Sequence, residues 1–207
     1  LLMTPRPPRS TPVISRQRQM CIGDRLIAGI LFGMRKKISL LSLGDLIAFA
    51  SPPGLFFGRI ANFINGELWG KPTTSTFGIQ FTKGPGKFCP SSNEIPCFRH
   101  PSQLYEAFFE GIVLMLIFYY LVFFYKALKK PGIIFGSFLL GYGVIRFSIE
   151  FLREPDAFFI TNENPYGYVV ELFPGVGMSM GQLLTIPMII FGLLMLLLVT
   201  KRNLDAN

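Results

Sequence analysis

Long apolar runs separated by short charged segments fill the chain from about residue 26 to its end. Four runs, at residues 40–63, 104–125, 132–151 and 181–199, have about the 20 residues that a helix needs to cross a bilayer. Their length favours helices over strands, because a uniform apolar run has no informative period. A fifth run, at 26–34, is too short to cross alone unless the residues before it contribute. The pattern predicts an all-α, polytopic transmembrane helix bundle with about four to five spans.

The run at 40–63 is interrupted by Pro52 and Pro53. Proline removes a backbone donor and clashes with the preceding turn of a helix. Irregular backbone at membrane depth is tolerated where it is buried in protein or lines a cavity. The proline pair therefore predicts a broken helix beside a protein cavity.

Basic residues gather in three places: Arg35–Lys37; Lys126, Lys129 and Lys130; and Lys201 with Arg202. With alternating spans all three clusters fall on one side of the membrane, and lysine and arginine mark the cytoplasmic side. We therefore expect a cytoplasmic C-terminus, with the loops at about 66–99 and 153–180 on the opposite side. Cys89 and Cys97 lie in the first loop, where an oxidising compartment would allow either a disulfide closing "CPSSNEIPC" or two free thiols.

Composition agrees with a membrane protein. Hydrophobic residues make up 50% of the 207 residues and charged residues only 15%, against about a quarter in soluble domains. The net charge of +8 would suggest nucleic acid in a soluble protein, but no zinc finger, glycine-rich phosphate loop or basic aromatic platform accompanies it. We attribute the charge to cytoplasmic loops and anionic lipid, and expect no nucleic-acid partner. The three cysteines form no metal-ligand pattern, so neither a metal nor another cofactor is expected.

The first 25 residues differ from the rest of the chain. They are rich in Pro, Arg and Ser, and they lack the apolar stretch of a signal peptide. We expect a disordered or non-native segment at 1–25, a transmembrane domain at 26–202 and a cytoplasmic tail at 203–207.

Polar residues concentrate at the outer ends of three of the runs. The stretch "GRIANFINGELWG" ends the run at 40–63, with Arg59, Asn62 and Asn65 at spacings of three and Glu67 just beyond. On a helix these residues form a slanted polar ridge. Charged groups are expensive near hydrocarbon and usually have a function or a partner there. Taken alone, Glu67 could be no more than an interfacial residue.

The run at 132–151 ends with Tyr142, Arg146, Glu150 and Arg153. Their spacings of four, four and three place all four side chains on one helix face. Taken alone, Glu150 could form structural ion pairs with Arg146 and Arg153, and Tyr142 could be an interfacial aromatic residue.

The run at 104–125 opens with a third polar group: His100, Gln103, Tyr105, Glu106 and Glu110. Taken alone, His100 could belong only to a helix start, with Ser102 as the N-cap. The three groups nevertheless converge on one membrane level from three spans, which is typical of a binding pocket.

The residue types indicate what such a pocket could bind. Two arginines facing one cavity suit an anionic oxygen group, because a guanidinium binds phosphate through two parallel donors. Asn62 and Asn65 add neutral donors, and Glu67 or Glu150 can hold an arginine or accept a proton. A cationic site near the headgroup level therefore suggests a phospholipid substrate. The chain has neither a Ser-His-Asp order nor an HExxH motif, which argues against a membrane protease, and no matching pair of interrupted spans suggests a transporter.

The stretch "GRIANFINGELWG" resembles the signature of the bacterial prolipoprotein diacylglyceryl transferases, G-R-x-x-N-F-x-N-x-E-x-x-G, and matches every fixed position from Gly58 to Gly70. Three further segments resemble that family in the same order: "RHPSQLYEAFFEG" at 99–111, "GYGVIRFSIEFLREPD" at 141–156 and "MSMGQLLTIPMI" at 178–189. Together these segments cover roughly residues 26–202.

The resemblance implies a multi-pass enzyme of the bacterial inner membrane with an active site facing the periplasm. Such an enzyme transfers the diacylglyceryl group of phosphatidylglycerol to the thiol of the lipobox cysteine in a prolipoprotein signal peptide. A thioether forms and glycerol-1-phosphate leaves, which is the first step of bacterial lipoprotein maturation. The expected partners are therefore phosphatidylglycerol, prolipoprotein signal peptides and the lipid bilayer.

The resemblance also implies which residues form the site. The substrate-binding residues would be Arg59, Asn62, Asn65, Glu67, Gly70, His100 and Arg146, and the catalytic residues Arg59, Arg146, Glu150 and Tyr142. We expect Arg59 and Arg146 to hold the phosphate and to stabilise the charge that develops on the leaving group. The nucleophile is the thiolate of the substrate, so no cysteine of this chain need react.

The N-terminal part departs from the family pattern. The family carries further spans before this point and a histidine in a segment that aligns with "MCIGDRLIA" at 20–28, where Gly23 stands instead. The single histidine of the chain is His100. We expect a truncated or misread gene, with a divergent enzyme and a chain that works without those spans as alternatives. A non-catalytic protein that binds anionic lipid, or a transporter subunit, is the competing function, and it predicts that Arg59 and Arg146 pair only with carboxylates and leave no cavity.

Overall fold

The computed structural model describes residues 27–81, 97–155, 159, 164, 167–173 and 176–205. The chain divides into two compact units, Leu1–Leu43 and Gly44–Asn207. The first unit contains a helix at 27–36, where the shortest apolar run was predicted, and the start of helix α2. The segment expected to be disordered or non-native, at 1–25, lies outside the described residues.

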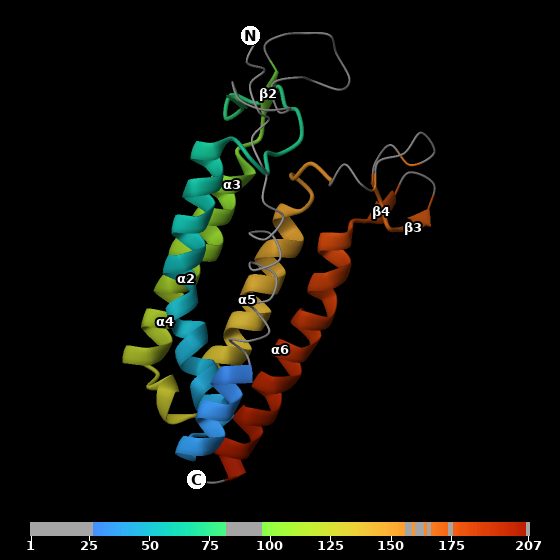
Figure 1. The fold of residues 1–207 in the computed structure, drawn as a ribbon. Coiled ribbons are helices and arrows are strands. Elements are labelled where there is room, and N and C mark those ends of the chain that lie inside the picture. Colours follow the sequence, from blue (N-terminus) through green and yellow to red (C-terminus); the bar gives the residue numbers. More distant parts are fainter. Residues whose placement is uncertain are drawn as a thin grey trace, which may run out of the picture. The chain divides into compact units, whose positions relative to one another are not determined.

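Helices dominate the second unit (Figure 1). They are α2 (Leu40–Asn65, which begins in the first unit), α3 (Ser102–Glu106), η2 (Ala107–Val113, a π-helix), α4 (Leu114–Phe123), η3 (Ala127–Lys129, a 3₁₀-helix), α5 (Ile133–Ile149) and α6 (Met180–Asp205). Because α3, η2 and α4 follow without a break, three helical segments are long and apolar enough to cross a membrane: Leu40–Asn65, Ser102–Phe123 and Met180–Arg202. Helix α5 is a shorter apolar helix. The predicted helical membrane bundle is confirmed.

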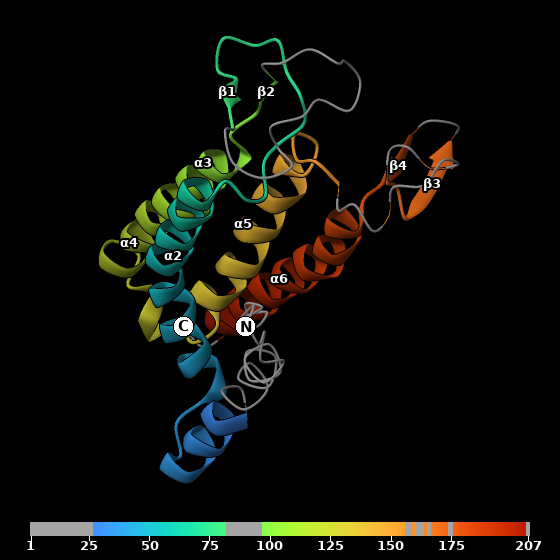
Figure 2. The ribbon, with the colours of Figure 1, turned by 45° about the horizontal axis from the view of Figure 1, so that its top comes forward.

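Two short antiparallel hairpins complete the second unit. Strand β1 (Ile79–Gln80) pairs with β2 (Phe98–Arg99), and β3 (Val170–Phe173) pairs with β4 (Val176–Met178). Both hairpins lie beyond the helix ends at which α3 and α6 begin (Figures 1 and 2). We call this the strand end of the unit. The opposite end carries η3 and the last turn of α6, with Lys126, Lys129, Lys130, Lys201 and Arg202, and we call it the lysine end.

A disulfide lies near the β1–β2 hairpin. Cys97 precedes β2, is buried and is disulfide-bonded. Cys89 lies outside the described residues, so the pairing of Cys89 with Cys97 stays a prediction.

The apolar core lies toward the lysine end. Leu114 and Phe118 of α4 pack with Ala48 of α2 and with Ile133 and Ile134 of α5, all nearly fully buried. Outward-facing apolar side chains are numerous on every long helix, for example Phe57, Leu116, Leu184 and Leu198. An apolar exterior around a modest core is the distribution that a lipid environment requires.

The predicted break in α2 is wrong, because the helix continues through Pro52 and Pro53. Ser51 donates its hydroxyl hydrogen to the carbonyl of Ile47, at 2.7 Å, one turn earlier. This carbonyl is also the one that the Ser51 N–H reaches in a helix, whereas Pro52 and Pro53 leave the carbonyls of Ala48 and Phe49 without their usual donors, so Ser51 does not replace those donors. Packing by neighbouring helices makes such prolines tolerable in a membrane-spanning helix. Pro52 itself is buried, so protein surrounds this turn of the helix.

Helix α5 begins at a buried carboxylate from another helix. Asp45 of α2 is 1% exposed and accepts the N–H groups of Gly132, at 2.7 Å, and Phe135, at 2.8 Å. Both N–H groups lie at the start of α5, where backbone donors have no acceptor within their own helix. The carboxylate also complements the positive end of the helix dipole. Asp45 thus fixes α5 to α2 at the lysine end.

Helices α5 and α6 lie side by side along their length (Figures 1 and 2). Glycine permits this approach, because a Cβ at Gly192 would lie 2.6 Å from the backbone nitrogen of Leu140 and 3.0 Å from the carbonyl of Gly136. Small residues let membrane helices pack backbone to backbone. The close pair brings the last residues of α5 next to the first residues of α6, where the polar site lies.

Candidate functional site

Six charged side chains form a buried cluster toward the strand end. This arginine–glutamate cluster consists of Arg59, Glu106, Glu110, Arg146, Glu150 and Arg153. The side chains are between 0 and 17% exposed. They come from α2, α3, η2, the end of α5 and the turn that follows, so the cluster joins spans that are distant in sequence.

Glu106 bridges the two arginines that sequence analysis singled out. Its Oε2 lies 3.0 Å from Nε of Arg59, and its Oε1 accepts a short hydrogen bond from Nη1 of Arg146. Glu106 is 1% exposed. The guanidiniums of Arg59 and Arg146 therefore converge on one carboxylate, although they belong to different helices.

Glu110 adds a second carboxylate on the Arg59 side. Its Oε2 accepts Nη2 of Arg59 at 3.2 Å and Nε at 3.3 Å. Glu110 is in the π-helix η2, and such wide turns occur frequently at functional sites. The next residue, Gly111, lets η2 approach α2 closely, because a Cβ there would lie 2.6 Å from Cβ of Phe56. This close approach places Glu110 within reach of Arg59.

Glu150 links the cluster to the start of α6. Its Oε2 lies 3.0 Å from Nη2 of Arg146 and 3.8 Å from Nη1 of Arg153. Its Oε1 accepts the hydroxyl hydrogen of Ser179 at 3.0 Å. A Cβ at Gly181 would lie 2.5 Å from the same oxygen, so glycine makes room for this carboxylate at the N-terminus of α6. The positive end of the α6 dipole adds to its stabilisation.

A capping box orients Ser179 and Gln182. The Gln182 N–H donates to the Ser179 hydroxyl at 3.2 Å, and the Ser179 N–H donates to Oε1 of Gln182 at 3.1 Å. The reciprocal pair satisfies the first donors of α6. The Ser179 oxygen accepts a hydrogen bond in this pair, and its hydroxyl hydrogen is donated to Glu150.

The cluster holds three positive and three negative side chains, but its hydrogen-bonding capacity is not exhausted. Nη1 of Arg59 has no hydrogen bond within the described part of the chain, and Oε1 of Glu110 is buried without a hydrogen-bond partner there. Oε2 of Glu150 also lacks a bond of good geometry, although two guanidiniums lie near it. An anion could therefore enter by exchanging with a carboxylate around guanidiniums that are already close together.

The structure brings Tyr142 near the cluster but keeps three other predicted residues apart from it. Tyr142 stacks on Phe138 at 5.6 Å between ring centroids, and its phenol interacts electrostatically with Arg59 and Glu110. Asn62 is half-buried, whereas Asn65 and Glu67 are exposed. In the described ranges, no side-chain hydrogen bond connects these three residues, Asn62, Asn65 and Glu67, to the cluster.

Gly70 and His100 meet through their backbones. The Gly70 N–H donates to the carbonyl of His100 at 2.9 Å, and a Cβ at Gly70 would lie 2.6 Å from that carbonyl oxygen and 2.7 Å from the carbonyl of Leu152. Only glycine fits between the two segments. Nδ1 of His100 is buried without a hydrogen bond to any described residue. The roles of Gly70 and His100 in binding stay predictions.

Two local expectations are wrong. Ser102 is not an N-cap: Pro101 holds that position, and the Ser102 hydroxyl donates to the carbonyl of Leu68 at 2.9 Å. Arg153 does not share the helix of Arg146, because α5 ends at Ile149. The chain turns away there since Leu152 accepts the Lys71 N–H and Arg153 forms a bridge with Gly70.

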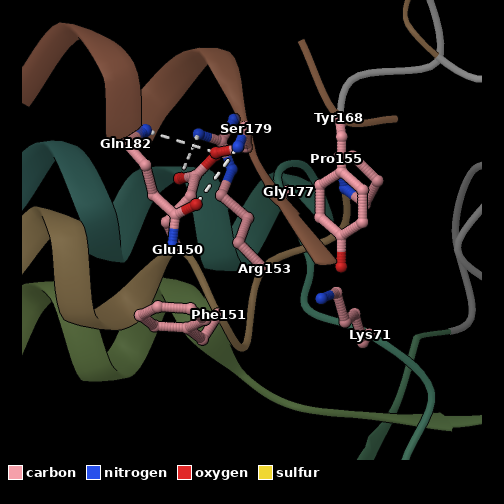
Figure 3. A pocket seen from close by; sticks show the side chains of 9 residues that line it. All are labelled: Lys71, Glu150, Phe151, Arg153, Pro155, Tyr168, Gly177, Ser179 and Gln182. Atoms are coloured by element: carbon pink, nitrogen blue, oxygen red, sulfur yellow. Dashed lines mark hydrogen bonds and ion pairs between the residues drawn. The ribbon is translucent and has the colours of Figure 1, made fainter. Parts of the chain in front are cut away.

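A pocket of about 100 Å³ adjoins the cluster at Glu150 (Figure 3). It is lined by Lys71, Glu150, Phe151, Arg153, Pro155, Tyr168, Gly177, Ser179 and Gln182. Neither Arg59 nor Arg146 is among these lining residues, and both arginines pair with carboxylates, as the competing lipid-binding interpretation predicted.

Comparison with known proteins matches residues 22–198 to the family described as prolipoprotein diacylglyceryl transferase. The chain belongs to this family. The prediction made from its motifs is therefore confirmed. The prolipoprotein diacylglyceryl transferase family also agrees with the membrane-spanning helices.

Individual relatives carry the name phosphatidylglycerol–prolipoprotein diacylglyceryl transferase. One from Cereibacter sphaeroides is 51% identical over 172 residues, which cover 83% of this chain and 58% of the relative. One from Rickettsia felis is 47% identical over 81% of this chain and 56% of the relative, and one from Caulobacter vibrioides is 46% identical over 79% and 51%. The chain thus spans little more than half the length of these diacylglyceryl transferases.

Four residues of the site were given no role by the sequence analysis. Glu106 and Glu110 were counted in the third polar group of the expected pocket but assigned neither a binding nor a catalytic role, although two carboxylates four residues apart in an apolar run need partners. Ser179 and Gln182 were not singled out, although S-x-x-Q before an apolar run is a capping-box signal. The bridging of two arginines by Glu106 depends on contacts between spans and has no sequence signal.

Proposed function

We propose that this chain takes part in the transfer of the diacylglyceryl group from phosphatidylglycerol to the thiol of a lipobox cysteine in prolipoproteins. The sulfur forms a bond to the glyceryl carbon as the bond from that carbon to the phosphate oxygen breaks. Glycerol-1-phosphate departs with the electron pair of the broken bond, and the thiol proton is lost so that the thiolate can attack. The relatives' names support both substrates.

The observation that carries the proposal is the convergence of Arg59 and Arg146 on Glu106. A phosphodiester that displaces this carboxylate would meet two guanidiniums already held at one place. Each guanidinium can offer paired donors to phosphate oxygens. In the transition state the same donors stabilise the charge that develops on the departing phosphate. Glu150 also pairs with Arg146, through Nη2 rather than the Nη1 that contacts Glu106. The phenol of Tyr142 interacts electrostatically with the charged groups of the cluster.

The test compares the chain with its Arg59→Gln and Arg146→Gln variants. Transfer of a labelled diacylglyceryl group from phosphatidylglycerol to a lipobox peptide is measured in detergent micelles. We expect each substitution to lower the transfer rate by about 100- to 1,000-fold, as the loss of one preorganised donor group does. The control is Lys129→Gln, which removes an exposed charge at the lysine end. Full activity of both arginine variants would refute the proposed role.

A non-catalytic protein that binds anionic lipid is the second candidate. It is favoured by the pairing of both arginines with carboxylates. It predicts phosphatidylglycerol binding without transfer by the same preparation. The transfer assay and a binding assay run in parallel therefore separate the two functions.

We also propose that the protein resides in the bacterial inner membrane with the strand end facing the periplasm and the C-terminus in the cytoplasm. The support is the gathering of Lys126, Lys129, Lys130, Lys201 and Arg202 at the lysine end, since basic residues favour the cytoplasmic side. Alkaline phosphatase fused after Thr76 should be active, and the same enzyme fused after Arg202 inactive. The reverse pattern would overturn the orientation.

A further inference from the structure

The pocket beside Glu150 is connected through that residue to Arg146, one of the two arginines that are proposed to hold phosphate. Glu150 contacts Nη2 of Arg146 at 3.0 Å and also lines the pocket. It follows Arg146 by four residues, so it lies about 6 Å further along the helix. A group attached to a phosphate at Arg146 and directed toward the strand end would therefore enter this pocket.

The charge of the pocket is biased toward positive. Lys71 and Arg153 are the cations of its lining, and Glu150 is the carboxylate (Figure 3). That carboxylate is already near Arg146 and Arg153 and accepts the hydroxyl of Ser179. Lys71 is exposed and its ammonium faces the hydroxyl of Tyr168 across the pocket (Figure 3). A cationic headgroup placed here would meet both of these like charges, and the carboxylate of the lining already lies close to two arginines.

The pocket also offers neutral hydrogen-bonding groups. Gln182 is 3% exposed, and its side-chain amide nitrogen has no hydrogen bond to any residue that the structure describes. The Tyr168 and Ser179 hydroxyls lie on the same lining. The Gln182 amide nitrogen is not among the fully buried atoms that lack a partner, so water or a ligand can reach it and accept its hydrogen bond. Hydroxyl groups of a ligand would do so without adding charge.

We infer that this headgroup pocket receives the terminal glycerol of phosphatidylglycerol and rejects phospholipids with cationic headgroups. The inference rests on the proposed function, because it places the phosphate at Arg59 and Arg146. Glycerol is neutral and carries two hydroxyls for Gln182, Tyr168 and Ser179. Ethanolamine or choline on the same phosphate would bring a positive charge against Lys71 and Arg153. Selection among headgroups thus comes from repulsion of the wrong lipid as well as attraction of the right one.

The experiment measures headgroup selectivity by displacement. A fluorescent phosphatidylglycerol bound to the chain in neutral detergent micelles is displaced by unlabelled phosphatidylglycerol or by phosphatidylethanolamine. Selectivity is the ratio of the two displacement constants. Because Lys71 is solvent-exposed and screened, we expect Lys71→Glu to lower this ratio by only about fivefold, and Lys71→Ala by about twofold. The decrease should come from tighter phosphatidylethanolamine binding.

A matched control is Lys129→Glu, which reverses an exposed charge at the lysine end. It should leave the selectivity ratio unchanged. An equal change in Lys71→Glu and Lys129→Glu would overturn the inference, because it would reflect general attraction of charged lipid. An unchanged ratio in Lys71→Glu would also overturn it, including the case in which only the affinity for a lipobox peptide falls. That last outcome would assign the pocket to the peptide substrate.

Failure of this inference can be told apart from failure of the proposed function. Arg146→Gln tests the phosphate site and should weaken binding of both lipids together. Retained binding of both lipids by Arg146→Gln would refute the phosphate site. Loss of binding by Arg146→Gln with no change of selectivity in Lys71→Glu would refute only the headgroup pocket.

Discussion

At the lysine end, Asp45 gives both carboxylate oxygens to backbone N–H groups of α5. At the strand end, Glu106 offers both of its carboxylate oxygens, and Glu110 one of its two, to arginine side chains. All three carboxylates are almost fully buried. Burial alone therefore does not distinguish a structural carboxylate from one in a candidate site, but the kind of partner does.

Backbone donors and guanidiniums differ in what they allow a ligand to do. The N–H groups that Asp45 binds belong to a helix start, so they cannot be offered to a ligand without unwinding α5. A guanidinium is carried on a long side chain and has five donors, so it can keep its bond to one carboxylate while it donates other hydrogen bonds to a phosphate. The lysine end is accordingly a fixed scaffold, and the strand end has partners that can be exchanged.

The largest effect is expected from Glu106→Gln, which breaks the charged cluster at its centre. The amide nitrogen cannot accept a hydrogen bond, so one of the two buried arginines loses its partner on Glu106. We expect the free energy of unfolding to fall by about 3 kcal/mol and the transfer rate to fall by about 100-fold. Thermal unfolding and diacylglyceryl transfer measure the two effects on one preparation.

Glu106→Asp distinguishes the effect of the carboxylate charge from the effect of the side-chain length. It keeps the carboxylate but shortens the side chain by one methylene, so it cannot bridge both arginines at their present separation. Most of the stability should return, while the transfer rate should stay low. Equal recovery of stability and transfer would show that the bridge does not set the arginine geometry.

The next effect tests the scaffold side of the comparison. Asp45→Ala removes two hydrogen bonds to the start of α5, and we expect the free energy of unfolding to fall by about 2 kcal/mol. Affinity for phosphatidylglycerol per folded molecule should not change, because the cluster lies at the other end. A loss of affinity at unchanged stability would mean that the two ends are coupled and that Asp45 is more than a scaffold residue.

Gly70→Ala tests the close packing that supports the strand end. The new Cβ would lie 2.6–2.7 Å from two carbonyl oxygens, so one of the segments carrying His100 and Leu152 must shift. Overpacking of this kind lowers the free energy of unfolding by about 1–3 kcal/mol. Gly54→Ala is the control, since nothing lies within 4 Å of a Cβ there. The control should be neutral or slightly stabilising because alanine favours helix. Equal stability of both variants would remove the argument for Gly70.

The spans could be predicted from sequence because their length and apolar character are dictated by the bilayer. The span predicted at 40–63 is a helix at Leu40–Asn65, and the span predicted at 181–199 lies within Met180–Asp205. The predicted break at Pro52 and Pro53 was wrong because local propensity yields to packing, and Pro52 is buried among neighbouring residues. The end of α5 was also misplaced, since a contact with Gly70, far away in sequence, ends that helix.

The candidate site was predictable only where partners share a helix. The pairing of Arg146 with Glu150 follows from their spacing of four, and the structure contains it. The bridge from Arg59 through Glu106 to Arg146 depends on how three spans are rotated about their axes. That rotation is set by contacts such as Gly111 against Phe56, for which a single sequence carries no periodic signal.

The smallest effect is expected from Glu110→Gln, and it sharpens the distinction between fixed and exchangeable partners. The amide keeps an acceptor oxygen for Arg59, and its nitrogen replaces Oε1, which has no hydrogen-bond partner among the described residues. The free energy of unfolding should change by less than about 1 kcal/mol. Because one negative charge leaves the cluster, affinity for phosphatidylglycerol should rise about threefold in the displacement assay. A large loss of transfer at unchanged stability and affinity would contradict this expectation, since it would require the Glu110 carboxylate to handle a proton during the reaction.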